Sequence, residues 1–435
     1  MIGRPMWRTR AAGLLSEGRW LAAIVALGTV LRVAMAVYLG NVVVPLPAAY
    51  DQVFFHDVAL NLLAGKGFVF TNPPWPFIQP GAPTAYTSFL YQLFLAGIYA
   101  VLGAQPLAAR LVQALLCSLM PWLVYRLVKE LLGEPPEAAG HVEAVALAAA
   151  AITAFYAYFV YYSATLMTEG PYLLAVAWGV ILTLQLARRP CLRDWALWGL
   201  AMGLAILLRQ VFMPIAALLL LYILWKARRE LRFAHLAAAI GVIAAMILPW
   251  TVRNHAVFHR FVLLNTEAGQ VFWNANHPDL GTDWQPDAMF PIPADLKGAN
   301  EAVLDDELMR RGIQEILADP GRFVGLSLSR LGTWVTFWPM ASSPPLSNVA
   351  RTLSFGICVP FMLAGLALSF RQASRWLLLY GFILAYTFIH VISWVQIRYR
   401  MPVDLLLVPF AALAAVRLAE AVRRRQPLPQ AEAGG

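Results

Sequence analysis

The sequence predicts an all-α, polytopic membrane protein with about ten transmembrane helices. Of the 435 residues, 60% are hydrophobic and only 13% are charged, whereas soluble domains carry roughly 25% charged residues. Apolar runs of membrane-spanning length recur along the whole chain. Arg and Lys gather at the ends of these runs, so the net charge of +9 indicates membrane topology and not a nucleic-acid partner.

The basic clusters assign the ends of the runs to two sides of the membrane. Arg4, Arg8, Arg10 and Arg19 precede the run 20–39, which predicts a cytoplasmic N-terminus. Later basic clusters lie at or after the ends of the runs 107–128, 169–187, 211–225, 351–370 and 402–420. If all these clusters are cytoplasmic, the runs 142–163, 193–208, 234–252 and 376–394 cross outward. We therefore expect a multi-pass protein of the inner (plasma) membrane with both termini inside.

Three further helices are expected on the outer side without crossing the membrane. The stretches 84–103 and 321–338 break the alternation of sides, and both mix polar with apolar residues, which is typical of interfacial or re-entrant helices. Over 51-64, Phe54 and Val58 begin a repeat of apolar residues every four positions. This helix is too short to span a bilayer and of the length to lie on one.

These elements divide the chain into four parts. Residues 1-252 form a membrane module that includes the outer loop 41-106 with the juxtamembrane helices 51-64 and 84-103. Residues 253-350 form an outer, periplasmic loop with amphipathic helices, residues 351-420 form a C-terminal three-helix membrane part, and residues 421-435 form a cytoplasmic tail.

Asp51 stands at the start of the predicted helix 51-64. One interpretation is a helix cap, because a carboxylate there is stabilised by unpaired backbone N–H groups. The topology supports a catalytic interpretation, since it places Asp51 on the same outer face as Glu169 and an unusual set of arginines. Asp57 lies off the Asp51 face, and we expect it to be solvated.

The predicted outer face holds more arginine than the positive-inside bias allows. Arg209, Arg253, Arg398 and Arg400 all fall at outer helix ends. Interfacial anchoring explains any one of them. A convergent set beside carboxylates suits an anionic head group, because guanidinium groups bind phosphate oxygens bidentately. A groove filled by lipid then favours a lipid phosphate.

Other chemistry leaves little trace in the sequence. No glycine-rich phosphate loop, HExxH or G-x-S-x-G motif is present, and the three cysteines lie too far apart to suggest a disulfide framework. His56, His277 and His390 leave a divalent metal site as an alternative that their spacing does not support. We expect no required cofactor.

Several segments follow one another in an order that is typical of a known family. They are Asp51 with Phe55, ALNLLAGKGF, PTAYTSFLYQLFL, AARLVQALL with Arg110, Thr168-Glu169-Gly170-Pro171, LAILLRQ, PWTVRNHAVFHRF, NTEAGQVFWNANHP and IRYRMPVDLLLVP. This order resembles the GT-C polytopic glycosyltransferases, in the branch of the protein O-mannosyltransferases and the aminoarabinose lipid A transferase.

The resemblance implies a GT-C-type bundle with a catalytic module of about seven helices over 20–252. It also implies that a sugar is transferred, with inversion, from a polyprenyl phosphate carrier, and that the family's outer-loop aspartate is Asp51. Family members often place a second acid next, where this chain has Gln52, and a tyrosine where it has Phe55. The aminoarabinose transferase also uses a metal site, for which this chain has no residue-by-residue match.

The resulting hypothesis is an inverting glycosyltransferase whose active site faces the periplasm or exterior. Asp51 is the expected general base, and Glu169 is expected to orient hydroxyl groups. The expected donor-phosphate ligands are Arg253, Arg398, Arg400, Arg209 and Lys66, and the expected sugar or acceptor ligands are Tyr86, Trp273, Asn274 and Asn276. The expected partners are a polyprenyl-phosphate-linked sugar, a glycan, lipid or protein acceptor, and membrane lipids.

Two other classes stay open at this point. A lipid or solute transporter would place its charges at the membrane midplane on discontinuous helices. A ligase or polymerase of lipid-linked glycans would also carry outer arginines. An assay for polyprenyl phosphate released from a polyprenyl-phospho-sugar separates these classes.

Overall fold

The structure, a computed structural model, describes residues 6–45, 50–73, 75, 78–133, 139–286, 288–340 and 345–425. Arg4 and residues 426–435 of the expected tail lie outside these ranges, as do the side chains of residues 6–17 and 346. Within the described ranges the chain is helical, and its β-structure is limited to one isolated bridge between Val69 and Pro83. The predicted all-α fold class is confirmed.

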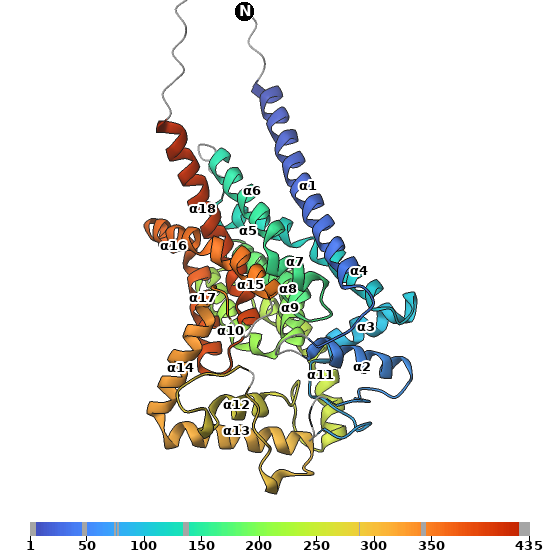
Figure 1. Cartoon of the computed structure of the whole chain (residues 1–435). Helices are drawn as coiled ribbons and strands as arrows, with labels where there is room; N and C mark the ends of the chain where they lie inside the picture. The colour runs from blue at the N-terminus through green and yellow to red at the C-terminus, as the bar shows by residue number, and fades with distance from the viewer. Residues whose placement is uncertain are drawn as a thin grey trace, which may run out of the picture.

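Most of the described helices pack in one bundle, and the others lie at its end or along its side (Figure 1). The bundle contains α1 (Met6–Leu39), α4 (Pro106–Cys117), α5 (Met120–Leu132), α6 (Ala139–Phe155), α7 (Ala157–Ala164), α8 (Glu169–Leu186), α9 (Leu192–Leu208), α10 (Met213–Ala227), α11 (Phe233–Phe258), α16 (Ile357–Ser369), α17 (Ala373–Ile392) and α18 (Met401–Arg425). The others are α2 (Asp51–Leu63), α3 (Phe89–Leu102), α12 (Ala268–Asn276), α13 (Glu301–Ala318), α14 (Pro320–Val335) and α15 (Pro345–Arg351).

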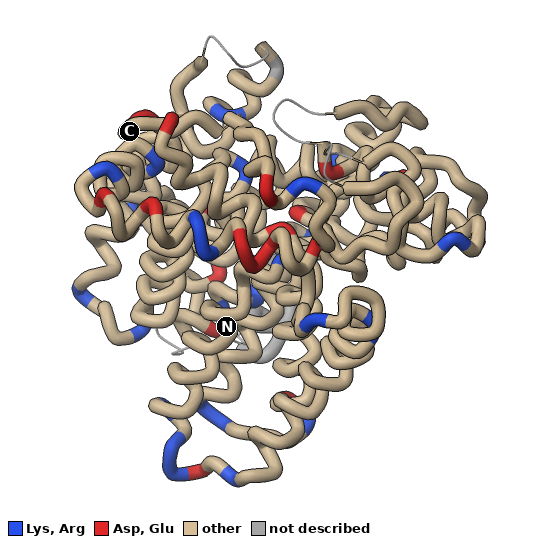
Figure 2. Tube along the Cα trace, turned by 90° about the horizontal axis from the view of Figure 1, so that it is seen from below, with Lys and Arg blue, Asp and Glu red and all other residues tan. Residues whose placement is uncertain are grey.

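Helices α12 and α13 cross one end of the bundle, and we call them the cap. The start of α1 and the end of α18 both lie at the opposite end (Figure 1). Viewed from the cap side, acidic residues lie close to Lys and Arg around the middle of this end (Figure 2). The cap end is therefore where the charged side chains that the sequence placed outside come together.

The described residues contain seven helical stretches long and apolar enough to cross a membrane, or eight if the bent pair α6 and α7 counts as one span. The sequence predicted about ten spans. The difference arises because the stretch Ser347–Ile392 contains two of the predicted runs and because α9 has only 17 residues. The stretches 84–103 and 321–338 form α3 and α14, with 14 and 16 residues.

Arg110 on α4 holds the segment that leads into α2. Its buried guanidinium donates to the carbonyl oxygens of Gly40, Val42 and Ala164 at 3.2, 2.9 and 2.9 Å, and to Oε1 of Gln52 at 3.4 Å. Gln52 in turn is buried. The residue at the place of the family's second acid therefore serves to anchor the start of α2, one position after Asp51.

Close contact between α12 and α13 depends on Gly269. A Cβ atom built on Gly269 would lie 1.8 Å from the carbonyl oxygen of Asp305, and the Gly269 N–H donates to the Asp305 side chain. Any side chain at position 269 would thus push the two cap helices apart.

We expect Gly269→Ala to lower the free energy of unfolding by about 1–3 kcal/mol, the usual cost of overpacking. Thermal unfolding of the purified protein in detergent measures this loss. Gly332→Ala is the matched control, because Gly332 is also helical and a Cβ there meets nothing within 4 Å. Equal stability of the two variants would show that the α12–α13 contact contributes little.

Candidate active site

Four charged side chains form a continuous cluster at the cap end of the bundle. Nη2 of Arg398 lies 2.9 Å from Oδ2 of Asp51, and Nε of Arg398 lies 3.6 Å from Oε1 of Glu169. Arg209 donates to the same Glu169 oxygen. Two guanidinium groups are thus paired with two carboxylates. Such pairing offsets the cost of keeping ionised side chains where little water reaches them.

Each member of the cluster stands at the end of a helix or in a short turn. Asp51 is the first residue of α2, with Tyr50 as the N-cap residue, and Glu169 is the first residue of α8. Arg209 links α9 to the next turn in an extended conformation, and Arg398 lies in η7 (Ile397–Arg400), just before α18. The helix dipoles of α2 and α8 favour a carboxylate at these N-termini.

Exposure distinguishes the two acids. The Asp51 side chain is 30% exposed, whereas the Glu169 side chain is 3% exposed and lies against both arginines. Asp51 is therefore the carboxylate that a substrate can reach. Glu169, which the sequence suggested as a ligand of hydroxyl groups, is placed to orient Arg209 and Arg398.

Tyr399 forms an aromatic support for both arginines. The guanidinium carbon of Arg209 lies 4.8 Å from the centre of the Tyr399 ring, and that of Arg398 lies 5.2 Å from it. Cation–π attraction at such distances stabilises a guanidinium that has lost water. The cluster is thus positioned by packing as well as by charge.

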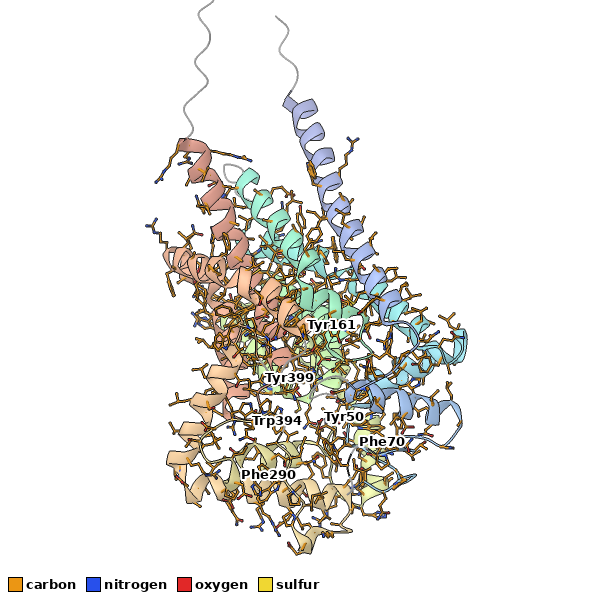
Figure 3. All side chains as sticks on the ribbon, in the orientation of Figure 1. Tyr50, Phe70, Tyr161, Phe290, Trp394 and Tyr399 are labelled. Atoms are coloured by element: carbon orange, nitrogen blue, oxygen red, sulfur yellow. The ribbon has the colours of Figure 1, made fainter. Side chains whose placement is uncertain are left out.

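A cavity of about 570 Å³ opens beside this cluster. Asp51 and Arg209 lie in its wall with Phe55 of α2, and Tyr399 and Trp394 form another part of the wall (Figure 3). The remaining lining residues are Thr87, Ser88, Thr168, Leu208, Gln210, Val211, Met213, Pro214, Asn265, Glu267, Ala268, Val271, Phe272, Met309, Ile389, His390 and Ser393. Its size and its mixture of apolar and polar walls are typical of a small-molecule site.

Of the five expected phosphate ligands, Arg209 lines this cavity, whereas Arg398 pairs with Asp51 beside it and the other three lie elsewhere. Arg253 donates to the Thr84 carbonyl at 2.9 Å, and its guanidinium lies 4.7 Å from the Trp250 ring centre. Arg400 is fully buried, with its Nε 2.9 Å from Oδ1 of Asp404. Lys66 is exposed in the turn after α2. Of the predicted set, Arg398 therefore pairs with Asp51, and Arg209 joins the same cluster through Glu169.

The expected sugar or acceptor ligands are also occupied elsewhere. The Tyr86 hydroxyl donates to Oε1 of Gln270 at 2.7 Å and accepts from the Trp75 indole. Trp273 is buried with Leu304 and Leu308 of α13, and Oδ1 of Asn274 accepts from the backbone of Phe290 at 3.1 Å. These side chains do not line the cavity.

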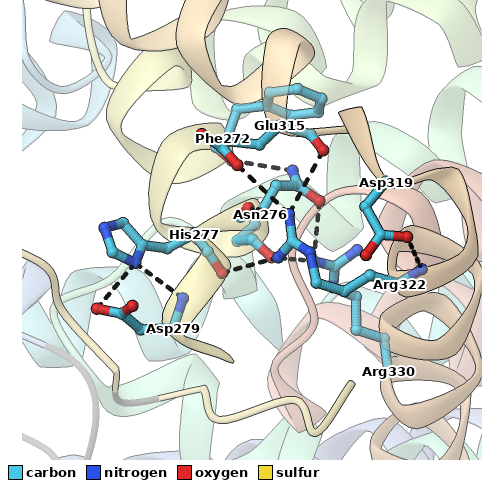
Figure 4. A network of polar contacts seen from close by, with 9 residues as sticks. Phe272, Asn276, His277, Asp279, Glu315, Asp319, Arg322 and Arg330 are labelled. Carbon is cyan, nitrogen blue, oxygen red and sulfur yellow. Dashed lines mark hydrogen bonds and ion pairs between the residues drawn. The ribbon is translucent and has the colours of Figure 1, made fainter. Parts of the chain in front are cut away.

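Asn276 belongs to a polar network that closes the last turn of α12 (Figure 4). Arg330 donates to the Ala275 carbonyl and to Oδ1 of Asn276, and Arg322 donates to the carbonyls of Asn276 and His277. Two cations thus cover the carbonyl end of the helix, where the dipole favours positive charge. This network fixes the C-terminal end of α12. The N-terminal end of the same helix, which begins after Glu267, faces the cavity.

Glu267, the N-cap residue of α12, is a cavity residue that sequence reasoning missed. Burial and the neighbouring Asp51 raise the pKa of Glu267 to about 7. Among the described residues its carboxyl group has no hydrogen bond or ion pair. The segment NTEAGQ contains an acid in an outer loop. An acid in a polar loop is usually solvated, so no local pattern distinguishes Glu267 from other surface acids.

The histidines considered for a metal site lie apart from one another. His56 is hydrogen-bonded to the Tyr99 hydroxyl at 2.9 Å, His277 stacks on Phe290, and His390 packs against Tyr399. Within the described ranges, no three His, Cys, Asp or Glu side chains are grouped to hold a metal ion.

The fold and part of the sequence match known proteins. The structure is similar to the oligosaccharyltransferase of Archaeoglobus fulgidus, with a TM-score of 0.57 and 14% sequence identity over 94% of this chain. The fold is therefore that of the GT-C membrane glycosyltransferases, as the sequence predicted. Residues 86–252 match the family model of the dolichyl-phosphate-mannose-protein mannosyltransferases, which confirms the resemblance to this class.

Two further results complete the comparison. ArnT from Cupriavidus metallidurans also matches, with a TM-score of 0.40, 14% identity, and coverage of 94% of this chain and 79% of that protein. A search of curated protein sequences gave no match. The chain spans about half the length of the archaeal oligosaccharyltransferase, namely 53% of it.

The raised pKa values in the cap predict how stability depends on pH. Burial raises the pKa of Glu267 to about 7 and that of Asp305 to about 6. The folded protein therefore holds protons that the unfolded chain releases at lower pH, so the free energy of unfolding falls as pH rises from about 5 to about 7. Glu307, whose pKa is lowered to about 2 by Arg310 and Arg311, titrates below this range.

We expect a higher melting temperature at about pH 5.5 than at about pH 8, and a smaller difference in Glu267→Gln. Differential scanning fluorimetry across this range measures both. Glu307→Gln serves as the control, because it should leave the change in melting temperature between these pH values as it is in the wild type. A wild-type melting temperature that rises with pH would contradict the assignment.

Proposed function

We propose that the chain is an integral-membrane glycosyltransferase that moves a sugar from a polyprenyl phosphate carrier to an acceptor hydroxyl or phosphate. The observation that carries the proposal is the pairing of a reachable carboxylate, Asp51, with Arg398 at the edge of the cavity. A base and a cation at one site suit a reaction in which a proton is removed and an anion departs.

The donor phosphate is assigned to Arg398 and Arg209. Both are held by Glu169 and by the Tyr399 ring, so a phosphate oxygen meets preorganised donors. Such preorganised cations stabilise the charge that develops on a leaving phosphate. The matched family is named for a dolichyl-phosphate-mannose donor, which supports a polyprenyl-phosphate-linked sugar as the donor class.

The reaction is a single displacement with inversion. Asp51 accepts the proton of the acceptor hydroxyl while the acceptor oxygen bonds to the anomeric carbon. The bond between that carbon and the phosphate oxygen breaks, and the oxygen leaves with the electron pair as polyprenyl phosphate. Arg398 and Arg209 stabilise the new negative charge. This mechanism uses the chain's own side chains and draws on no metal ion or other cofactor.

We place the reaction at the outer face of the inner or plasma membrane. The basic clusters near α1 and at the end of α18 support a cytoplasmic location for the end of the bundle opposite the cap. The cavity then faces the periplasm or exterior, where glycan, lipid or protein acceptors are available.

Reconstitution in lipid nanodiscs tests the proposal. The protein is supplied with a polyprenyl-phospho-sugar and with cell-envelope glycan, lipid and peptide acceptors, and polyprenyl phosphate and glycosylated product are measured together. Stoichiometric release of both supports the glycosyltransferase. Transfer of intact donor across a proteoliposome membrane would support the transporter instead, and joining of whole lipid-linked glycans would support the ligase or polymerase.

A further inference from the structure

His390, a residue of the cavity wall, has a ring nitrogen whose hydrogen-bonding capacity is unused. Nδ1 of His390 lies 3.2 Å from the carbonyl oxygen of Trp394. A carbonyl oxygen only accepts, so Nδ1 carries the hydrogen and Nε2 of the neutral ring carries a lone pair. Nε2 is buried and has no hydrogen-bond partner, and the whole side chain is 4% exposed. A buried acceptor of this kind is costly unless a ligand supplies the donor.

Glu267 presents a second unused group to the same cavity. It stands at the N-terminus of α12, and among the described residues no side chain or backbone group bonds to its carboxyl group. The opposite end of α12 is fixed by Arg322 and Arg330. Glu267 is therefore held on a rigid support, as a ligand-binding residue requires.

Aromatic rings complete this part of the wall. Phe272, Trp394 and Tyr399 line the cavity with Glu267 and His390, and Figure 3 labels Trp394 and Tyr399. Amphipathic rings beside a few well-placed polar groups are typical of sites that fix the orientation of a small ligand. A sugar ring offers both apolar C–H faces and hydroxyl groups to such a wall.

The charges in the cavity select against an acidic sugar. Asp51 and Glu267 both face the cavity, whereas Arg209 is the guanidinium in its lining and is already paired with Glu169. The donor phosphate adds another negative charge at the arginines. A carboxylate on the sugar would then meet the charge of Asp51, and above about pH 7 also that of Glu267, in a weakly solvated place.

We propose that Glu267 and His390 bind hydroxyl groups of the donor sugar, and that this sugar carries no carboxylate. The inference rests on the proposed function, because the phosphate at Arg398 and Arg209 places the attached sugar in the cavity. Nε2 of His390 accepts from one hydroxyl, and the Glu267 carboxyl group binds another. Both are sugar-binding residues, and the proton transfer remains with Asp51.

Binding to the protein in nanodiscs tests this assignment without requiring the acceptor. The probes are undecaprenyl phosphate alone and undecaprenyl phosphate carrying mannose, glucose, galactose or galacturonate. We expect at least one of the lipids that carry a neutral sugar to bind the protein more tightly than undecaprenyl phosphate alone. Glu267→Ala and His390→Asn should each reduce this increase in affinity about tenfold, the value of one to two hydrogen bonds, and leave the Kd of undecaprenyl phosphate unchanged.

The choice of variants separates binding from folding. His390→Asn retains a donor for the Trp394 carbonyl and removes the group in the place of Nε2. It also removes ring contacts with Trp334 and Tyr399, so unchanged binding of undecaprenyl phosphate is the check that the variant is folded. Asp306→Asn is the control, because Asp306 is an exposed acid on α13 outside the cavity, and it should change neither affinity. The wild type should bind the lipid that carries galacturonate more weakly than the lipid that carries galactose. Glu267→Gln should reduce this difference in affinity.

Three results would overturn the inference. They are equal affinity for all sugar-bearing and sugar-free lipids in the wild type, an equal loss of sugar-free and sugar-bearing binding in the variants, and tighter binding of the galacturonate lipid. Failure of the proposed function looks different, since undecaprenyl phosphate itself would then not bind or would bind Arg398→Lys as tightly as the wild type.

Discussion

Asp51→Asn is expected to reduce kcat by about a thousandfold, within the usual range for loss of a general base. The amide keeps the size of the side chain and its place at the start of α2, but it cannot accept the acceptor's proton. Binding of the donor should persist, because the phosphate ligands Arg209 and Arg398 are unchanged. Turnover of a polyprenyl-phospho-sugar and equilibrium binding of undecaprenyl phosphate measure the two effects separately.

Asp57→Asn is the matched control on the same helix. The Asp57 carboxylate accepts hydrogen bonds from the backbone of Thr71 at 2.7 Å and of Asn72 at 3.3 Å, so it holds a loop and does not face the cavity. The amide oxygen can still accept, and we expect kcat close to wild type. Wild-type turnover in Asp51→Asn would remove Asp51 as the base.

Arg398→Lys is expected to lower kcat by about a hundredfold and to weaken donor binding about tenfold. Lysine keeps the positive charge but loses the planar fork that reaches Asp51 and Glu169 together. Single-turnover rates and the Kd of undecaprenyl phosphate measure the two losses. Arg398→Ala should be more severe and should also lower the melting temperature, because it removes the partner of a buried acid.

Arg400→Lys separates the site from the surrounding structure. Arg400 lies two positions further along the chain but pairs with the buried Asp404, so this variant should lose stability rather than donor affinity. Retention of full kcat and Kd by Arg398→Lys would show that the phosphate lies elsewhere.

The sequence predicted much of the fold because its physical basis is local. The four-residue repeat from Phe54 predicted a helix over 51-64, and α2 covers Asp51–Leu63. Charge at the ends of apolar runs predicted that Asp51, Glu169, Arg209 and Arg398 share one face, and the structure brings these four into contact. The helical repeat of apolar residues and the clustering of charge at the ends of apolar runs both involve residues close in sequence. They can therefore be recognised without knowing how the helices pack.

The division of roles among the arginines could not be predicted in this way. Arg398 and Arg400 have the same chemistry and nearly the same position, and only the 3₁₀ turn before α18 directs one toward Asp51 and the other toward Asp404. The role of Glu267 could not be predicted for a different reason. It reaches the cavity because α12 folds back across the bundle, a contact that no local pattern encodes.

The sharing of Arg398 by Asp51 and Glu169 has a kinetic consequence for the proposed enzyme. While the site is empty, Arg398 occupies one oxygen of the Asp51 carboxylate. An incoming phosphodiester competes for the same guanidinium and releases the carboxylate, so the site becomes reactive only after the carrier has arrived. The expected kinetics are ordered, with the lipid-linked sugar first and the acceptor second.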